Sequence, residues 1–163
     1  MRPSEIHTRI EAVISSAAGN PYEHAPRVYP EDPESDGDGG FKDFETSIDD
    51  HLETKGIAIL CYLDTGKKAA GRNRKNLIDV ETKYTLAVTE NRIRRVEAVA
   101  ESAGIDKGAP TVAEEIMLLL SEEFDVCDTR EDLSFQEDCL MWIPNENGLI
   151  QWDINLLIKT QIR

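Results

Sequence analysis

Hydrophobic residues recur at helical spacing in three stretches of the chain. The first stripe consists of Ile6, Ile10, Val13, Ile14 and Ala17. It follows Ser4, whose side chain can accept hydrogen bonds from free helix amides, and it stops at Gly19. The second stripe consists of Phe41, Phe44, Ile48 and Leu52. Both patterns predict amphipathic helices, the second of which ends before Gly56.

The third helical pattern lies in "TVAEEIMLLLSEEF". Thr111 and Glu114 have the spacing of a capping box, in which each side chain bonds a free amide of the first turn. The stripe expected to be buried consists of Val112, Ile116, Leu119 and Leu120. The preceding stretch, residues 90–108, is open to two interpretations. It is either irregular, or its apolar residues Ile93, Val96 and Ala100 make another helical turn or two.

Four segments have the hydrophobic pattern of strands. "GIAILCYL", residues 56–63, is short and continuously apolar, as in a strand covered on both faces. "TKYTLAVTEN" alternates apolar and polar positions and can pair antiparallel with it. "CLMWIPNENGLIQWDINLLIKTQI" contains two more strands around a "PNENG" turn. Alternation is most sustained in the last one, which predicts one core face and one wet face.

Two long connections separate these elements. "NPYEHAPRVYPEDPESDGDGG" carries four prolines, so we expect an irregular segment with a flexible acidic loop at 30–40. Residues 64–80 form a long basic loop in this interpretation. The order helix, helix, strand, strand, helix, strand, strand predicts a single α+β domain over 1–163. Its core is a four-stranded, mainly antiparallel sheet covered on one face by helices.

Composition limits the function without defining it. The chain has 163 residues and is 40% hydrophobic, which suffices for one core. Its net charge of -14 argues against broad attraction to nucleic acid or anionic lipid. No apolar run approaches the roughly 20 residues of a membrane span, so we expect a cytoplasmic location with no membrane partner. The three cysteines form no C-x-x-C pair and are interpreted as buried thiols, with no cofactor expected.

The charge is arranged in blocks. Residues 30–53 contain ten acidic and one basic residue, and residues 111–138 contain the same numbers. Between them, residues 54–80 contain six basic and two acidic residues. The basic candidates for a contact loop are Lys67, Lys68, Arg72, Arg74 and Lys75, and the candidate acidic face is Glu114, Glu115, Glu122, Glu123 and Asp125. Opposite potentials can orient copies of one chain against each other, although solvated faces also explain such blocks.

"DPESDGDGGFKD" has the acidic spacing of an EF-hand calcium loop, with Gly37 at the sixth position. Pro30 and Pro33 prevent an entering helix, and Gly39 stands where a hydrophobic residue is needed. The twelfth residue is the short Asp43 in place of glutamate. A flexible acidic loop therefore explains the segment better than a calcium site.

Patterns typical of catalysis are weak. Asp49, Asp50 and His51 are consecutive, so on a helix they point in different directions. His7 and His24 are isolated in the sequence. The "DTG" triplet resembles the aspartic-protease signature, but that chemistry needs two similar halves and the chain has no internal repeat. We therefore expect no enzymatic activity.

The order of local motifs resembles the tail-terminator or tail-completion proteins of tailed bacteriophages and prophages. The likeness covers most of the chain. It runs through the N-terminal helix, "PRVYP", "ETKGIAILCYL", a basic loop, "KYTLAVTEN" with "RIRR", "AGIDKGAP", "TVAEEIMLLL" and a long alternating last strand. The acidic loop and "VEAVAESAG" are longer than the family pattern.

The resemblance implies a non-enzymatic virion protein, assembled in the bacterial host cytoplasm. Such a protein forms a ring, commonly a hexamer, on the last ring of the tail tube and joins the tail to the head connector. DNA passes through the ring without specific binding, and acidic walls would repel its phosphates. The basic loop would then be an assembly arm that contacts a neighbouring subunit or the tube.

A second hypothesis comes from composition alone. A small acidic protein can act as a DNA mimic or as an immunity-type inhibitor that presents carboxylates to a basic partner. The basic block distinguishes the two hypotheses, because a DNA mimic is not expected to carry one.

Overall fold

The structure is a computed structural model that describes residues 6, 9–10, 12–14, 27–29, 49–50, 52–68, 78–101, 106–125, 132–144 and 148–162. Its elements are β1 (Arg27–Tyr29), β2 (Ile57–Lys68), β3 (Ile78–Glu90), α3 (Arg92–Ala100), α4 (Ala109–Asp125), β4 (Asp132–Pro144) and β5 (Ile150–Ile162). Residues 6, 9–10 and 12–14 are also helical, as are 49–50 and 52–54. The α+β class predicted from the sequence is confirmed.

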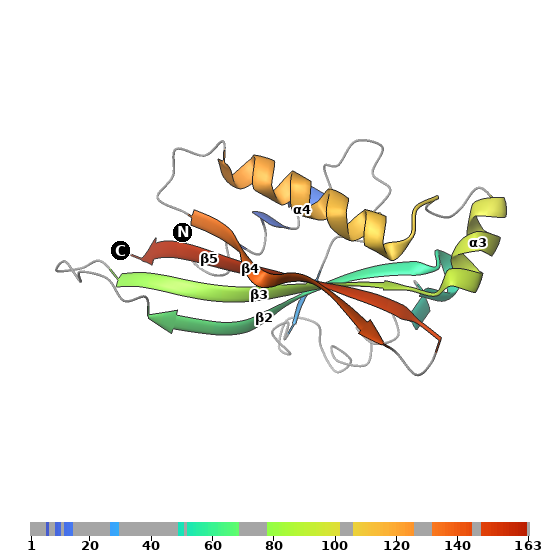
Figure 1. Ribbon diagram of the computed structural model, residues 1–163, viewed down its shortest axis with the longest axis horizontal. Helices are drawn as coiled ribbons and strands as arrows, with labels where there is room; N and C mark the ends of the chain where they lie inside the picture. The colour runs from blue at the N-terminus through green and yellow to red at the C-terminus, as the bar shows by residue number, and fades with distance from the viewer. Residues whose placement is uncertain are drawn as a thin grey trace, which may run out of the picture.

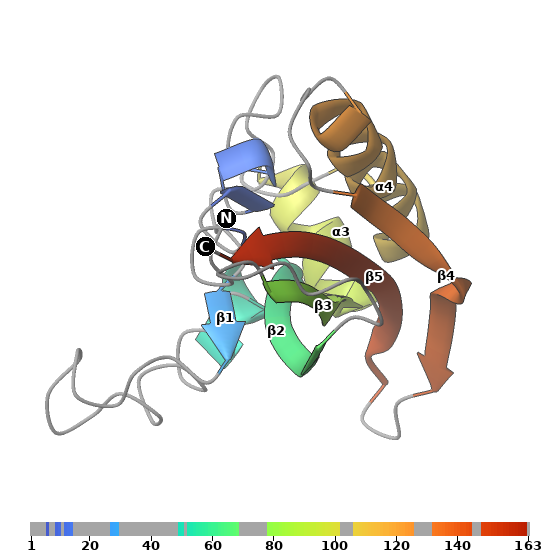
Figure 2. The ribbon, with the colours of Figure 1, turned by 90° about the vertical axis from the view of Figure 1, so that its left-hand side faces the viewer.

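The strands form one sheet in the order β1-β2-β3-β5-β4. The four long strands pair antiparallel, and β1 adds parallel to the outer edge of β2. The central β3 and β5 are in register over their full lengths, from Ile78 opposite Ile162 to Glu90 opposite Ile150. Figure 1 shows α4 lying across one face of this sheet and α3 at the end where β3 stops. Figure 2 shows how strongly the sheet curves.

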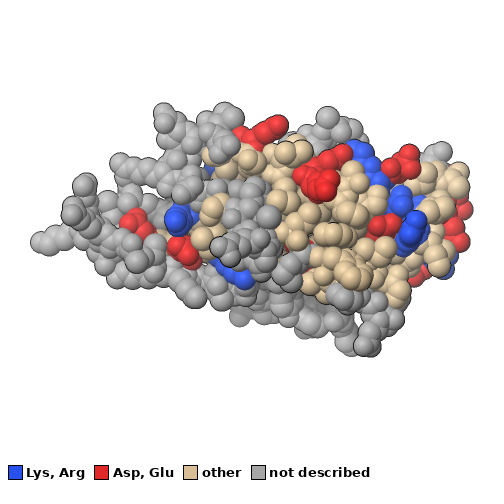
Figure 3. Space-filling view, in the orientation of Figure 1, with Lys and Arg blue, Asp and Glu red and all other residues tan. Residues whose placement is uncertain are grey.

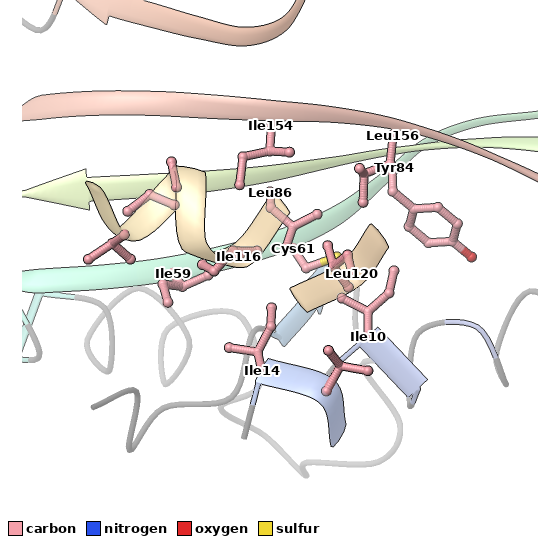
Figure 4. Close-up of a cluster of buried hydrophobic side chains, with 14 of the residues drawn as sticks. Ile10, Ile14, Ile59, Cys61, Tyr84, Leu86, Ile116, Leu120, Ile154 and Leu156 are labelled. Carbon is pink, nitrogen blue, oxygen red and sulfur yellow. The ribbon is translucent and has the colours of Figure 1, made fainter. Parts of the chain in front are cut away.

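The hydrophobic core lies between one face of the sheet and the helices. The even-numbered residues from Tyr84 to Val88 and from Ile154 to Ile158 point into it, among them Leu86, Ile154 and Leu156, which are fully buried. They meet the N-terminal helical residues and α4 (Figure 4), as the apolar stripes of the sequence predicted. Cys61 is a buried free thiol in this core, as predicted. Burial, with the neighbouring Cys61 as a smaller cause, raises the pKa of Tyr84, so the phenol stays neutral at physiological pH.

One of the four residues of the predicted α4 stripe differs in burial from the other three. Val112, Ile116 and Leu120 are fully buried, whereas Leu119 is only partly buried against the core. Ala113 and Phe124 complete the buried side of the helix. In the second predicted helix, Leu52 is buried and the helical residues end before Gly56, as expected. Phe41, Phe44 and Ile48 lie outside the described residues.

The sheet face opposite the core is partly buried, whereas the sequence predicted that the polar side of the last strand would face water. Asn155 is 6% exposed, and the hydroxyl of Thr85 on the neighbouring strand donates a hydrogen bond to its side-chain oxygen over 3.0 Å. Ala58 and Ala87 are also buried. The polar alternation of β5 is therefore partly internal, because cross-strand hydrogen bonding satisfies polar groups that water would otherwise solvate.

The predicted connections need correction. The long basic loop at 64–80 was wrong at both ends, because β2 continues through Lys68 and β3 begins at Ile78. Backbone pairing places Lys68 opposite Val80. The charged residues here are therefore paired in a strand, although their polarity led to the prediction of a loop. The irregular segment before the acidic loop contains β1, which its prolines concealed. The acidic loop at 30–40 lies outside the described residues.

Strand β4 is longer than the sequence pattern predicted. It begins at Asp132, well before Cys139, where the apolar run starts. Between Phe135 and Leu140 the register with β5 is interrupted by an irregularity. Such a bulge changes which side chains face the core, so simple alternation fails across it. Strand β4 ends at Pro144 and β5 begins at Ile150, on either side of the predicted "PNENG" turn, whose residues 145–147 lie outside the described residues.

Two threonines of β3 provide a matched test of the two sheet faces. The Thr82 hydroxyl is buried and has no hydrogen-bond partner among the described residues, whereas the Thr85 hydroxyl donates to Asn155. We expect Thr82→Val to leave stability unchanged or to raise it by up to about 1 kcal/mol, because it removes a desolvated polar group. We expect Thr85→Val to cost about 1 to 3 kcal/mol, because it removes a partner of a buried amide. Equal effects in urea titrations would contradict the assignment of the faces.

Asp153 predicts a pH dependence of stability. Burial raises the pKa of its carboxyl, an effect that the hydrogen bond from Gln151 opposes. Because the folded pKa lies above the unfolded value of about 3.9, stability from this group is present below that value and is lost as pH rises through the folded pKa. We therefore expect Asp153→Asn to be more stable than the wild type at pH 7. This gain in the free energy of unfolding should shrink towards pH 3, and a variant less stable than the wild type at pH 7 would refute the explanation.

Candidate functional site on helices α3 and α4

A buried carboxylate joins the end of β3 to both following helices. Glu90, the last residue of β3, is 2% exposed. Its Oε2 accepts a hydrogen bond of 2.8 Å from the backbone N–H of Ala109, the first residue of α4. Its Oε1 accepts a bond of 2.7 Å from Nε of Arg95 on α3. One side chain thus fixes the positions of α3 and α4 relative to the sheet.

This contact replaces the capping box predicted at Thr111. The backbone of α4 starts earlier, with the N–H of Val112 donating to the carbonyl of Gly108 over 3.1 Å, and Thr111 is an exposed residue inside the helix. A carboxylate at a helix N-terminus bonds a free amide and interacts favourably with the positive end of the helix dipole. The sequence contains a signal for Glu90, since it shares the even, core-facing parity of Tyr84, Leu86 and Val88. A charge on that face indicates a buried partner.

Gly56 holds α3 close to the start of β2. Its φ is +76°, and a Cβ built there would lie 2.1 Å from the backbone nitrogen of Arg95. The carbonyl of Gly56 accepts a bond of 2.8 Å from the N–H of Asn91. Asn91 in turn caps α3, because its Oδ1 accepts a hydrogen bond from the N–H of Arg94. The close approach and the positive φ both require glycine at this position.

Helix α3 turns its large apolar residues outward. Ile93 is 72% exposed and Val96 is 56% exposed, whereas the buried residue of the helix is Ala98. Of the two interpretations left open for residues 90–108, the structure has the helical one at Arg92–Ala100. Arg92, at the first position of the helix, is also exposed. We call Arg92, Ile93 and Val96 the α3 patch.

Some carboxylates of the predicted acidic face of α4 form ion pairs with other described residues, and others do not. Glu114 and Glu122 are exposed, whereas Glu115 pairs with Lys107 and Glu123 pairs with Arg9. Asp125 is the last residue of α4, and the structure does not describe its side chain. Figure 3 shows acidic side chains over α4 and mixed charges at the end that carries α3.

A hydrophobic side chain interrupts the acidic surface of α4. Leu118 is 65% exposed, one turn after Glu114 and one turn before Glu122. The stripe of buried residues on the other side of the helix does not include it. We call Glu114, Leu118 and Glu122 the α4 patch.

Arg9 attaches the N-terminal helical residues to the last turn of α4. Its Nε lies 3.4 Å from Oε1 of Glu123, and its Nη2 donates to the Glu123 carbonyl over 3.3 Å. The guanidinium also lies 4.4 Å from the centre of the Phe124 ring. A cation near the carbonyl end of a helix is favoured by the helix dipole, and its position over an aromatic ring adds a cation–π contact.

The structure describes only some of the other sequence candidates. Lys67 and Lys68 end β2, at the opposite end of the sheet from α3, and Arg72, Arg74 and Lys75 lie outside the described residues. Asp49 and Asp50 are exposed helical residues. His7, His24, His51 and Cys127 also lie outside the described residues. Asp64 of the "DTG" triplet lies in β2, at a shift in its register with β3.

Within the described part of the chain, no group of three or more histidine, cysteine, aspartate or glutamate side chains is arranged to hold a metal ion. The described helices include none that is long and apolar enough to cross a membrane. The residues that the structure does bring together therefore form a polar junction at Glu90 and two exposed helical patches.

Comparison with known proteins returned no assignment. No protein-family model matches the chain, and no curated protein sequence matches it significantly.

The Glu90 junction predicts a large difference between two ion pairs of similar geometry. Glu90→Ala should cost about 3 to 5 kcal/mol of unfolding free energy, because it leaves the Arg95 charge partly buried without this partner and the α4 amide uncapped. Glu90→Gln should cost less, since its amide oxygen can still accept the Ala109 hydrogen bond. The control is Glu97→Ala, which removes the exposed pair with Arg94 at 2.9 Å and should change stability little. Chemical denaturation measures all three, and a Glu90→Ala variant as stable as Glu97→Ala would refute the role of the junction.

Proposed function

We propose that this chain is a structural virion protein that forms a ring at the head-proximal end of a phage tail tube. There it terminates the tail and joins it to the head connector. The observation that carries the proposal is the order of elements, which resembles the layout expected of the tail-terminator family. "PRVYP" supplies β1 at the edge of the sheet, "RIRR" opens α3, "TVAEEIMLLL" lies in α4, and the alternating last segment is the central β5.

The surfaces of the described residues support an assembly role. Exposed hydrophobic side chains lie beside charged ones on both helices, Ile93 and Val96 on α3 and Leu118 on α4, and a protein contact could bury them. The net charge of -14 suits a channel wall that DNA must pass without adhering to it. The partners in this proposal are further copies of the chain, the tail-tube protein and the head-connector protein.

The basic residues remain a proposed contact with a neighbouring protein, although Lys67 and Lys68 lie in a strand and not in the predicted loop. Lys67 and Lys68 are part of a strand, so they would present charge from a paired backbone at the end of the sheet remote from α3. A contact there would meet a different neighbour from any contact made by α3. Acidic groups on the tube would suit it, since complementary charge fixes orientation and register.

Disruption of the gene in the genome that encodes this chain tests the proposed function. We expect tails of uncontrolled length that fail to join heads, and we expect the wild-type chain supplied in trans to restore normal particles. A variant with Lys67, Lys68, Arg72, Arg74 and Lys75 neutralised should restore them less well. Electron microscopy of the particles provides the measurement. Tails of normal length with heads attached, in the absence of the chain, would contradict the proposal and favour the inhibitor or DNA-mimic hypothesis.

A further inference from the structure

The α3 patch reverses the usual arrangement of a surface helix. Its two largest apolar side chains, Ile93 and Val96, are exposed on one side, and the small Ala98 packs inward. Exposed β-branched residues three positions apart form a contiguous apolar surface on a helix. The Gly56 approach explains why a small residue faces inward, but it does not explain why large apolar residues face outward.

The α4 patch has complementary chemistry. Leu118 provides one exposed apolar side chain, and Glu114 and Glu122 provide negative charge on either side of it along the helix. Within the described part of the chain, neither carboxylate has an ion-pair partner. Arg92, the positive charge of the α3 patch, likewise has none there.

We propose that the α3 patch of one copy of this chain docks on the α4 patch of the next copy. Ile93 and Val96 cover Leu118, and Arg92 lies against the carboxylates of Glu114 and Glu122. This inference rests on the proposed ring function and names the contact between its subunits. Apolar burial supplies the attraction, and the Arg92 charge selects the acidic helix and sets its orientation.

The positions of the patches specify the kind of assembly. Helix α3 lies at one end of the sheet and α4 lies across its face, so the two patches are different surfaces of one molecule (Figures 1 and 2). A contact between unlike patches is heterologous and leaves one patch free at each end of a pair of copies. Repetition of such a contact closes into a ring or continues as a filament. A two-fold symmetric dimer would instead need the α3 patch and the α4 patch of each copy to meet the other copy at the same time.

A second copy is a better occupant than an unrelated partner because one chain carries both complementary patches. Its net charge of -14 makes copies repel at long range, so a contact needs a local cation at the point of approach. Arg92 is placed to provide it. At physiological ionic strength the Debye length is about 8 Å, which screens the distant repulsion and leaves close contacts effective.

The test uses the full-length chain and its variants Ile93→Asp and Leu118→Asp at physiological salt. Sedimentation velocity and native mass spectrometry should show concentration-dependent association of the wild type. Each variant should raise the dissociation constant at least about tenfold, because a charge replaces a buried apolar contact. Both substitutions are at exposed positions, so circular dichroism and melting should match the wild type. Ile78→Asp is the matched control, since Ile78 is an exposed isoleucine at the far end of β3 from Glu90.

Mixing the two defective variants tests the heterologous geometry directly. The Ile93→Asp chain retains an intact α4 patch, and the Leu118→Asp chain retains an intact α3 patch. An equimolar mixture should therefore form a one-to-one heterodimer and nothing larger. A charge exchange gives a second test: Arg92→Glu should weaken association, and adding Glu114→Arg and Glu122→Arg to the same chain should restore it.

Several outcomes would overturn the inference. These are a wild type that stays monomeric at the highest concentration measured, variants that associate normally, or a mixture that forms no heterodimer. Loss of association on Trp142→Ala but not on Ile93→Asp would place the interface at the β4 edge instead, where Trp142 is also exposed. Normal tails made with the two patch variants would refute this contact while the tail function stands. Association in solution through the two patches, together with normal tails and heads after disruption of the gene, would support this contact and refute the tail function.

Discussion

The buried carboxylate of Glu90 is the interaction on which the arrangement of the helices depends. Charge in an interior is costly unless it is paired and hydrogen-bonded, and here the same carboxylate has both an arginine and a helix amide. The two partners come from different helices, so neither helix can shift without leaving charge unsatisfied. The junction therefore fixes the end of β3, the start of α3 and the start of α4 as one unit, which in turn determines where both exposed patches lie.

The same junction explains the unusual exposure of α3. This helix is attached by Arg95, by the Asn91 cap and by the close approach to Gly56, with Ala98 as its buried residue. Polar and backbone contacts hold it in place, so its large apolar side chains are not needed for attachment and point away from the domain. Helix α4 is attached differently, by a full hydrophobic stripe, and carries charge on its outer side. The two helices thus present surfaces of opposite character, which is the basis of the proposed contact between copies.

The second face of the sheet contributes specificity more than hydrophobic burial. A one-residue slip between β3 and β5 would exchange the core and polar faces and would separate Thr85 from Asn155. A hydrogen bond between buried polar groups penalises that slip, because each group would be left desolvated. The half-buried Asp153 lies on the same face and raises the cost of folding at neutral pH. Burying polar groups in this way lowers stability, but it favours a single strand register.

The sequence by itself determined the class of the fold and most of its core. The even positions of β5 and the stripe through Val112, Ile116 and Leu120 have periods that local geometry converts directly into buried faces. The tertiary structure alone decided the rest, because the deciding contacts join residues distant in sequence. The start of α4 depends on a side chain 19 positions earlier, and β1 exists because the edge of β2 offers it hydrogen bonds. The α3 patch illustrates the limit most clearly. An apolar pair at helical spacing has the same sequence pattern whether it is buried or exposed. The contacts of Arg95 with Gly56 and Glu90, which join residues from different elements, determine which side of α3 meets the domain.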